Sequence, residues 1–355
     1  MEIGSIFEIN PLDIFKSPLE CGGIYPFDKD EDFKFEYYNT GRAAIESLLV
    51  FLKAQGHSKV WMPSFNCSSV REAAERAGME IKLFNMGRDL SFSLPEKVEN
   101  GDIIYLVQYF GKVWDNSVYD NLDVVRSKGC VIIEDITLSI FSEKSGMVGV
   151  GDYLIGSIRK WLPITDGGFI ASRKGLPNVT KSFAANDYTL YYFAAQVMKN
   201  EYLHNKKIDK QIFLDISNLG MKALFSDYTV REMSDISYRV IASTDFKEVA
   251  KRRNSNYDSL YSMLESVHQV RTLVKRENGM CPLGLIISVD DRDGLFKHLI
   301  ANGVYCNIHW RPNESTAEFE DSSWLADHCI TLPCDQRYGE REMIYIFETI
   351  KTYFE

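Results

Sequence analysis

Lys160 is the residue of this sequence whose side chain offers the most distinctive chemistry. It follows Arg159 in the segment GDYLIGSIRKWLPITDGGFIAS, residues 151–172, which is predicted to form an apolar strand, a polar turn and a second strand. Neighbouring positive charge and partial burial favour the neutral form of a lysine amine, which can then form a Schiff base with a carbonyl compound. The alternative is a surface lysine in a loop. Residues elsewhere in the chain are needed to distinguish the two interpretations.

Pyridoxal phosphate (PLP) is a cofactor with three requirements: an amine for a Schiff base, a carboxylate facing its pyridine nitrogen, and donors for its phosphate. Lys160 offers the amine. Asp135, at the end of a predicted buried strand, offers the carboxylate, whose negative charge would keep the ring nitrogen protonated. Gly41 and Arg42 begin a predicted helix, and the first N–H groups of a helix and the positive end of its dipole favour a phosphate.

Two hydroxyl groups, those of Thr40 and Ser157, are further candidate donors to the phosphate. Thr40 also fits the N-cap of the predicted helix, which is compatible with a contact to the phosphate. Asp135 taken alone equally fits a turn or a helix cap. The prediction of a PLP site therefore depends on whether these residues come together in the fold.

The hydrophobic pattern predicts the elements that would position them. Apolar residues repeat on one face of residues 42–56, which predicts a helix with Thr40 as N-cap and Gly56 at its end. Strands alternating with helices predict an α/β fold: a three-layer α/β/α large domain with a mainly parallel sheet. The strands are predicted at 59–62, 81–84, 103–107 and 131–133. Ligands of such sheets bind beyond the carboxyl ends of the strands, which here are followed by Asn66, Gln108, Asp135, Ser157 and Lys160.

The chain is expected to have three parts. Residues 1–35 are predicted to be an irregular N-terminal arm, and residues 36–245 the large cofactor-binding domain. Residues 246–355 are predicted to form a smaller C-terminal α/β domain, in which residues 304–310 (VYCNIHW) would be one of the strands.

Composition excludes several classes of protein. The net charge of −10 gives no basic face for nucleic acid. No apolar run approaches the length of a membrane span, and the N-terminus lacks the basic start of a signal peptide. The seven cysteines are scattered and none forms a C-x-x-C pair, so neither a metal site nor a disulfide framework is indicated. A cytoplasmic protein is expected.

Several segments in order resemble the DegT/StrS family of PLP-dependent sugar aminotransferases, which have the aspartate aminotransferase fold (fold type I). The resemblance covers residues 36–355. The segments are NTGRAAIESLL, MPSFNCSSV, YLVQYFG, VIIEDITLSIFS, GDYLIGSIRKWLPITDGGFI, RDGLFKHLIANGVYCNIHWRP and ITLPCDQRYGEREMIYI.

The resemblance assigns roles to individual residues. Lys160 resembles the Schiff-base lysine, Asp135 the aspartate at the pyridine nitrogen, and Gly41 and Arg42 the phosphate-binding turn. His309, Trp310 and Arg311 match a family segment at the mouth of the site, where they would contact the substrate; a packed strand end and a solvated arginine are the alternatives. Members of the family are usually homodimers with the active site at the subunit interface, so the resemblance also implies a homodimer.

The sequence departs from the family pattern around the cofactor ring. Cys67 stands where the family carries an aromatic residue that stacks on the ring, and Leu138 stands where Gln or His often lies near the ring hydroxyl. Ser157 is closer to the lysine than in many members. The asparagine that usually reaches the phosphate from the neighbouring subunit has no clear counterpart at residues 228–231.

The expected function is a PLP-dependent aminotransferase that moves an amino group from an amino acid, glutamate in most of the family, to a keto sugar linked to a nucleotide. Polysaccharide biosynthesis is a pathway that the family suggests. A PLP-dependent sugar dehydratase is an alternative, although dehydration in the family accompanies loss of the lysine. A non-catalytic protein that keeps the fold for binding or regulation is another, and Cys67 and Leu138 favour it.

Overall fold

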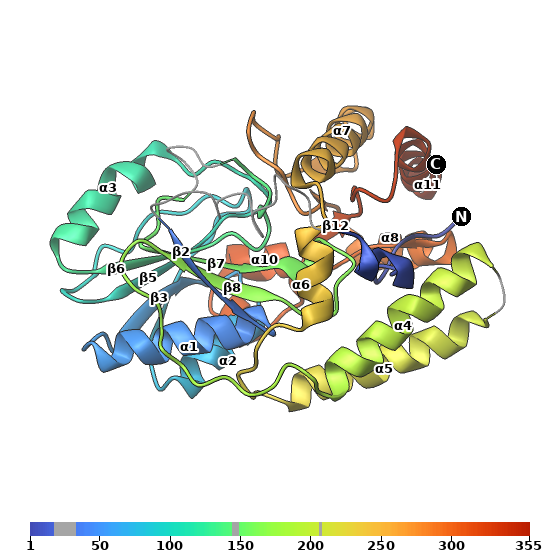
Figure 1. Ribbon diagram of the computed structural model, residues 1–355. Helices are drawn as coiled ribbons and strands as arrows, with labels where there is room; N and C mark the ends of the chain where they lie inside the picture. Colours follow the sequence, from blue (N-terminus) through green and yellow to red (C-terminus); the bar gives the residue numbers. More distant parts are fainter. Residues whose placement is uncertain (18–32, 144–148, 206–207) are drawn as a thin grey trace. The chain divides into compact units, whose positions relative to one another are not determined.

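The computed structural model describes residues 1–17, 33–143, 149–205 and 208–355 (Figure 1). Part of the predicted N-terminal arm, residues 18–32, lies outside these described ranges. The chain forms two compact units, which are described separately. The first unit contains Met1–Ser5, Leu52–Leu154 and Lys247–Glu355, and the second contains Ile6–Phe51 and Ile155–Phe246.

The main sheet has the strand order β2-β8-β7-β6-β5-β3-β4 among the described residues. Strands β3, β4, β5 and β6 pair in parallel, whereas β2 and β8 pair antiparallel. The boundary between the two units falls inside β7, after Leu154. The bounds are β2 (Lys34–Tyr38), β3 (Lys59–Pro63), β4 (Glu80–Phe84), β5 (Ile103–Val107), β6 (Val131–Asp135), β7 (Tyr153–Ser157) and β8 (Gly168–Ser172).

Strands β5 and β6 are buried along their whole length. Their sequences, IIYLV and VIIED, have apolar residues on both faces, as expected for strands covered by helices on each side of a parallel sheet. The strands predicted at 59–62, 81–84, 103–107 and 131–133 are thus confirmed, to within two residues at each end.

Helices α2 (Ser68–Arg76) and α3 (Asn116–Ser127) connect the parallel strands of the first unit. Helix α2 joins β3 to β4 and α3 joins β5 to β6, and these two connections run in opposite directions across the sheet. Because such crossovers are right-handed, the two helices belong on opposite faces, as Figure 1 shows. The predicted α/β fold is confirmed, and the direction of winding reverses between the neighbouring strands β3 and β5.

Helix α1 (Gly41–Ala54) begins and ends as the sequence predicts. The Thr40 hydroxyl oxygen accepts a hydrogen bond of 3.0 Å from the Ala43 N–H, which makes Thr40 the N-cap. Gly56 has φ +102°, a left-handed conformation that favours glycine after a helix. The side chains that repeat on the inner face are all buried: Ala44, Ile45, Leu48, Leu49 and Leu52.

The second unit continues through three helices, α4 (Asp187–His204), α5 (Lys210–Ser226) and α6 (Asp235–Ala242). Helices α4 and α5 lie side by side (Figure 1). A Cβ atom at Gly220 of α5 would be 3.3 Å from the backbone nitrogen of Tyr192 in α4, so glycine permits this close contact.

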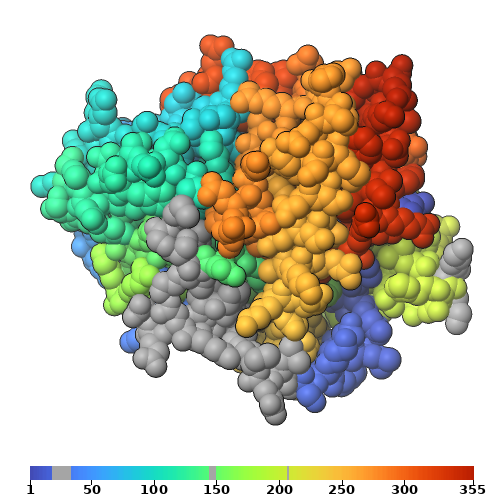
Figure 2. All heavy atoms as spheres, turned by 90° about the horizontal axis from the view of Figure 1, so that it is seen from above, coloured from blue at the N-terminus to red at the C-terminus, as the bar shows by residue number. Residues whose placement is uncertain are grey.

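The C-terminal part of the first unit is built around a sheet of order β12-β10-β9, and β1 (Ile3–Gly4) pairs in parallel with β11. Figure 2 shows α7 and α11 side by side on the surface, and both contribute to one hydrophobic core. The bounds are α7 (Phe246–Leu264), β9 (Arg271–Thr272), β10 (Leu285–Ser288), α8 (Arg292–Ala301), β11 (Val304–Tyr305), α9 (Glu314–Ala317), α10 (Glu320–His328), β12 (Cys329–Leu332) and α11 (Glu340–Phe354).

The strand predicted at 304–310 was wrong in its length, because only Val304–Tyr305 is a strand. Beyond it, Asn307 makes an isolated bridge to Thr331, and the chain continues without regular structure through Trp310. None of the helices in the described ranges is long and apolar enough to cross a membrane. In the same ranges, no group of three or more His, Cys, Asp or Glu side chains is placed to bind a metal ion.

Candidate functional site

The predicted site residues fall into two groups, one in each unit, and each group is described within its own unit. The first unit holds Cys67, Asp135, Leu138, His309, Trp310 and Arg311. The second unit holds Thr40, Gly41, Arg42, Ser157 and Lys160.

Asp135 ends β6 and is 6% exposed. Its carboxylate accepts one hydrogen bond on each oxygen: the Tyr105 hydroxyl donates to Oδ2 at 2.5 Å, and the Thr137 N–H donates to Oδ1 at 2.8 Å. These two donors fix the plane of the carboxylate, while each oxygen keeps a further lone pair. Asp135 can therefore accept another hydrogen bond, such as one from a protonated ring nitrogen.

Glu134, the preceding residue of β6, faces the other side of the sheet and has a different role. Its fully buried carboxylate accepts hydrogen bonds from the N–H groups of Gly149 and Gly151, at 3.1 and 2.9 Å, and from the Gln108 amide at 3.3 Å. Burial raises the pKa of Glu134, although these donors oppose the rise. Glu134 thus holds the segment that leads into β7, and Asp135 is the acid available to a ligand.

Asn66 and Cys67 follow β3 at its carboxyl end. Asn66 is 5% exposed; its Oδ1 accepts the Cys67 N–H at 2.7 Å, but its Nδ2 has no hydrogen-bond partner among the described residues. A buried amide donor left without an acceptor costs about 1–3 kcal/mol, which an acceptor oxygen on a ligand would remove. The half-buried Cys67 thiol lies 3.1 Å from the Ser69 hydroxyl.

Trp310, next to His309, forms an aromatic cluster with Phe65 and Tyr109, which follow the ends of β3 and β5. The Trp310 ring makes edge contacts with Phe65 and Tyr109, at centroid distances of 5.2 and 6.1 Å. His309 packs on Phe110, and its Nδ1 lies 3.0 Å from the Thr331 hydroxyl. The winding of the sheet reverses between β3 and β5, and ligands of such sheets bind at the carboxyl ends of that strand pair.

The other two predicted residues of the first unit differ in their surroundings. Leu138 is buried, and its carbonyl oxygen accepts the Leu283 N–H at 2.9 Å. Arg311 is exposed, with its guanidinium 5.9 Å from the ring of Phe296 on α8.

In the second unit, the start of α1 lies against Ser157 and the first residue of β8. A Cβ atom at Gly41 would be 3.2 Å from the Ser157 Cβ, so the Ser157 side chain faces the first turn of α1. A Cβ atom at Gly168 would be 2.3 Å from the carbonyl of Thr40 and 2.5 Å from the Gly41 nitrogen. Only glycine at 168 allows this contact between two backbones. The structure therefore brings Thr40, Gly41 and Ser157 together.

Lys160 is half-buried and lies in a short 3-10 helix, Ile158–Lys160, that follows β7. The loop that carries it is closed at Gly167, whose carbonyl oxygen accepts the Ile158 N–H at 2.9 Å and whose N–H donates to the Asn39 carbonyl at 2.8 Å. Gly167 has φ +137°, a conformation that favours glycine. The Lys160 loop is thus tied to the residue that precedes Thr40.

Asp166 anchors the same loop. This role of Asp166 was not predicted from the sequence. Its buried carboxylate accepts the Ser234 N–H at 3.0 Å and the hydroxyl groups of Ser234, Ser237 and Thr165 at 2.6, 2.5 and 3.2 Å. Burial raises the pKa of Asp166 and these donors oppose the rise. The sequence showed Asp166 only as a turn residue before two glycines, because its partners Ser234 and Ser237 lie about seventy positions away.

The Arg42 side chain turns away from the first turn of α1. Its guanidinium donates to the carbonyl oxygens of Leu224 and Asp227, at 2.8 and 2.9 Å, and lies 4.1 Å from the ring centroid of Tyr228. The carbonyls at the C-terminal end of α5 attract positive charge. A role of Arg42 toward a phosphate therefore has to use its backbone N–H.

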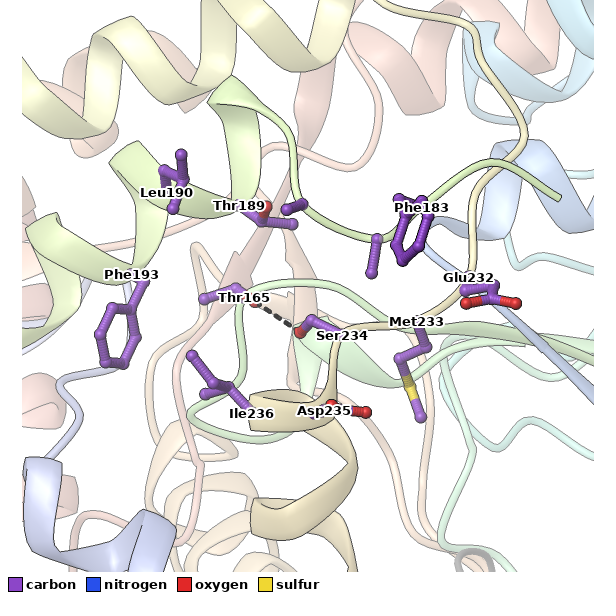
Figure 3. A pocket seen from close by; sticks show the side chains of 12 residues that line it. Thr165, Phe183, Thr189, Leu190, Phe193, Glu232, Met233, Ser234, Asp235 and Ile236 are labelled. Carbon is purple, nitrogen blue, oxygen red and sulfur yellow. Dashed lines mark hydrogen bonds between the residues drawn. The ribbon is translucent and has the colours of Figure 1, made fainter.

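A cavity of about 360 Å³ lies elsewhere in the second unit, between the first turns of α4 and α6 (Figure 3). Phe183, Leu190, Phe193 and Met233 give it apolar walls, and the Thr165 and Ser234 hydroxyl groups lie 3.3 Å apart beside it. None of the predicted site residues is among the residues that line it.

The described residues fit PLP in two respects. The first turn of α1 packs without side chains against Gly168 and faces Ser157, and the start of a helix favours a phosphate. The Asp135 carboxylate and the Asn66 amide offer a buried acceptor and a buried donor at strand ends.

Comparison of the sequence with protein-family models and with curated protein sequences finds no match. Solved structures are similar. Spr1654 from Streptococcus pneumoniae, named as a sugar aminotransferase and solved in its PLP form, is 16% identical, with 99% of this chain and 98% of that chain covered at a TM-score of 0.69. The sugar aminotransferase CalS13 from Micromonospora echinospora is 15% identical, with 99% and 100% covered at 0.67.

A DegT/DnrJ/EryC1/StrS aminotransferase from Brucella abortus is also similar, at 15% identity and a TM-score of 0.61, with 90% of this chain and 85% of that chain covered. These likenesses extend over nearly the whole chain at low identity, and they confirm the predicted fold. The chain has the α/β fold that is shared by these sugar aminotransferases.

Proposed function

We propose that the protein is a PLP-dependent aminotransferase that moves an amino group from an amino acid, glutamate by preference, to a keto sugar linked to a nucleotide. The observation that carries this proposal is the Lys160 loop, which hydrogen bonds at Gly167 tie to the start of a helix whose first N–H groups suit a phosphate. This link supports the proposal, because it connects the loop that carries the Lys160 amine to a helix start of the kind that binds anions.

Each residue has a distinct role in this mechanism. PLP, once bound, supplies an electron sink that stabilises negative charge on the Cα of the donor amino acid. Lys160 Nζ would hold the cofactor, and its free amine would take the proton from that Cα. Asp135 would hold the ring nitrogen in its protonated form. The N–H groups of Gly41 and Arg42, with the hydroxyls of Thr40 and Ser157, would bind the phosphate.

The acceptor proposal is supported by the aromatic cluster and by the similar proteins. The face of an aromatic ring such as that of the half-buried Trp310 suits the apolar face of a sugar or a nucleotide base. DesI, another solved structure with this fold, was crystallised in the presence of its TDP-sugar product. His309 is proposed to contact the same substrate and Arg311 its anionic groups.

Other properties stay predictions. They are the boundaries at residues 35 and 245, the homodimer, the cytoplasmic location, the role in polysaccharide biosynthesis, and the placement of Cys67 and Leu138 beside the cofactor ring.

The experiment that tests the proposed function is an absorption spectrum of the purified protein with PLP, recorded before and after glutamate is added. We expect a visible band that glutamate bleaches. Lys160→Ala should lose the band and keep the fold, whereas Lys222→Ala, which removes an exposed lysine, should keep it. The control is needed because PLP also reacts with surface lysines.

The other outcomes separate the alternatives. A band that needs Lys160 but ignores glutamate would indicate another donor or the dehydratase. A band that survives in Lys160→Ala, or no band in the wild-type protein, would contradict the proposal and favour a protein that keeps the fold only for binding or regulation.

A further inference from the structure

Tyr105 is a polar residue in an otherwise aliphatic strand. Strand β5 has the sequence IIYLV and is buried throughout, and Tyr105 itself is 0% exposed. A hydroxyl group in such a place needs a hydrogen-bond partner, because an unpaired buried hydroxyl is costly. A main-chain carbonyl serves that purpose for two other buried tyrosines of this unit, Tyr109 and Tyr257, which donate to Phe65 and Val274.

The partner of Tyr105 is instead the carboxylate of Asp135. In the parallel pairing of β5 with β6, Tyr105 is opposite Ile133 and Val107 is opposite Asp135. Tyr105 and Asp135 are therefore diagonal neighbours on one face of the sheet, within reach of a long side chain. Burial raises the pKa of Tyr105 well above its ordinary value, and the Asp135 charge raises it further, so the hydroxyl stays a donor at any working pH.

We propose that Tyr105 is a positioning residue that orients the Asp135 carboxylate toward the ring nitrogen of the cofactor and so sets the strength of that contact. The inference rests on the proposed function, and it adds a residue that touches Asp135 rather than the cofactor. The Thr137 N–H holds only Oδ1, so without Tyr105 the carboxylate is free to turn about this single bond.

The test measures how strongly the protein discriminates between PLP and deazapyridoxal phosphate, in which a carbon atom replaces the ring nitrogen. Only PLP can make the contact with Asp135, so the ratio of the two dissociation constants isolates that contact from the phosphate and Lys160 contacts. Equilibrium dialysis gives both constants without any turnover. The proteins are the wild type, Tyr105→Phe and the matched control Tyr257→Phe, which removes a buried hydroxyl bonded at 2.6 Å to a carbonyl.

We expect the preference of the wild-type protein for PLP to fall about tenfold or more in Tyr105→Phe, the size expected when a hydrogen bond to a charged group is lost. The control should keep the wild-type ratio, which excludes a general effect of a lost buried hydroxyl. A preference in Tyr105→Phe that is unchanged or higher overturns the inference and leaves the proposed function standing. If the wild type binds neither compound, or binds both equally, the role of Asp135 fails and the inference fails with it.

Discussion

Replacement of Gly168 by alanine tests whether the start of α1 depends on backbone contact with β8. The added Cβ atom would lie 2.3 Å from the Thr40 carbonyl and 2.5 Å from the Gly41 nitrogen, distances that real Cβ atoms essentially never show. Both partners are backbone, and β8 is held in register by the pairing of Gly168 with Tyr38. Relief therefore requires the first turn of α1 to move by roughly 1 Å, since interiors are close-packed.

Gly168→Ala should lower both the unfolding free energy and the affinity for PLP, and the size of each effect can be stated. Overpacking of this kind costs about 1–3 kcal/mol of unfolding free energy. A misplacement of about 1 Å in a binding turn costs up to roughly a hundredfold in function, so the affinity for PLP should fall much further than stability alone requires. The dissociation constant for PLP and the midpoint of thermal unfolding are the quantities to measure.

The matched control is Gly175→Ala. Gly175 follows the same strand, but a Cβ atom there would have nothing within 4 Å. We expect this variant to keep the wild-type affinity for PLP and to change stability by less than about 0.5 kcal/mol. If Gly168→Ala binds PLP and unfolds as Gly175→Ala does, the packing of β8 against α1 does not shape the phosphate site, and the reasoning is refuted.

Two further substitutions test a carboxylate with a proposed catalytic role, Asp135, and a buried carboxylate with a structural role, Asp335. Asp135→Asn should still bind the cofactor through Lys160 but lose about a hundredfold in transamination rate, because a neutral amide no longer holds the ring nitrogen protonated; unchanged turnover would remove Asp135 from the mechanism. Asp335→Asn should lower the unfolding free energy by about 3 kcal/mol at pH 7. Arg337 donates hydrogen bonds to both Asp335 oxygens, at 2.8 and 2.9 Å. The substitution removes the negative charge that partners Arg337 and the buried Arg253. Burial acts to raise the pKa of Asp335, but the charge and hydrogen bonds of Arg337 and the charge of Arg253 hold it below its ordinary value. This stabilisation should thus be complete above about pH 5 and fade as the pH falls below it, and denaturation curves that differ equally at low and neutral pH would contradict the assignment.

The sequence predicted features whose cause is local. Strands β5 and β6 were predictable because a short apolar run can be buried on both faces, and the start of α1 because Thr40 can cap it. The extent of β11 was not, because the strand pattern at 304–310 continues into Trp310, whose ring instead packs on Phe65 and Tyr109. Tertiary packing overrode strand propensity there.

Features that depend on register or on distant partners could not be read from the sequence. The bond from Tyr105 to Asp135 requires the alignment of β5 with β6, and a shift of one residue would turn Tyr105 to the other face. Asp166 looked like a turn residue, yet its carboxylate binds Ser234, the N-cap of α6, and Ser237 within that helix. Neither pairing leaves a local pattern.

The contacts that shape the predicted phosphate site depend mostly on backbone. The turn needs a left-handed glycine at Gly167, a glycine without a side chain at Gly168, and a short capping residue at Thr40. Few side chains are fixed by these demands, which is consistent with a fold retained at about 16% identity to Spr1654. Cys67 and Leu138 are not part of these backbone contacts. If they lie beside the cofactor ring as predicted, they would affect the ring and not this turn.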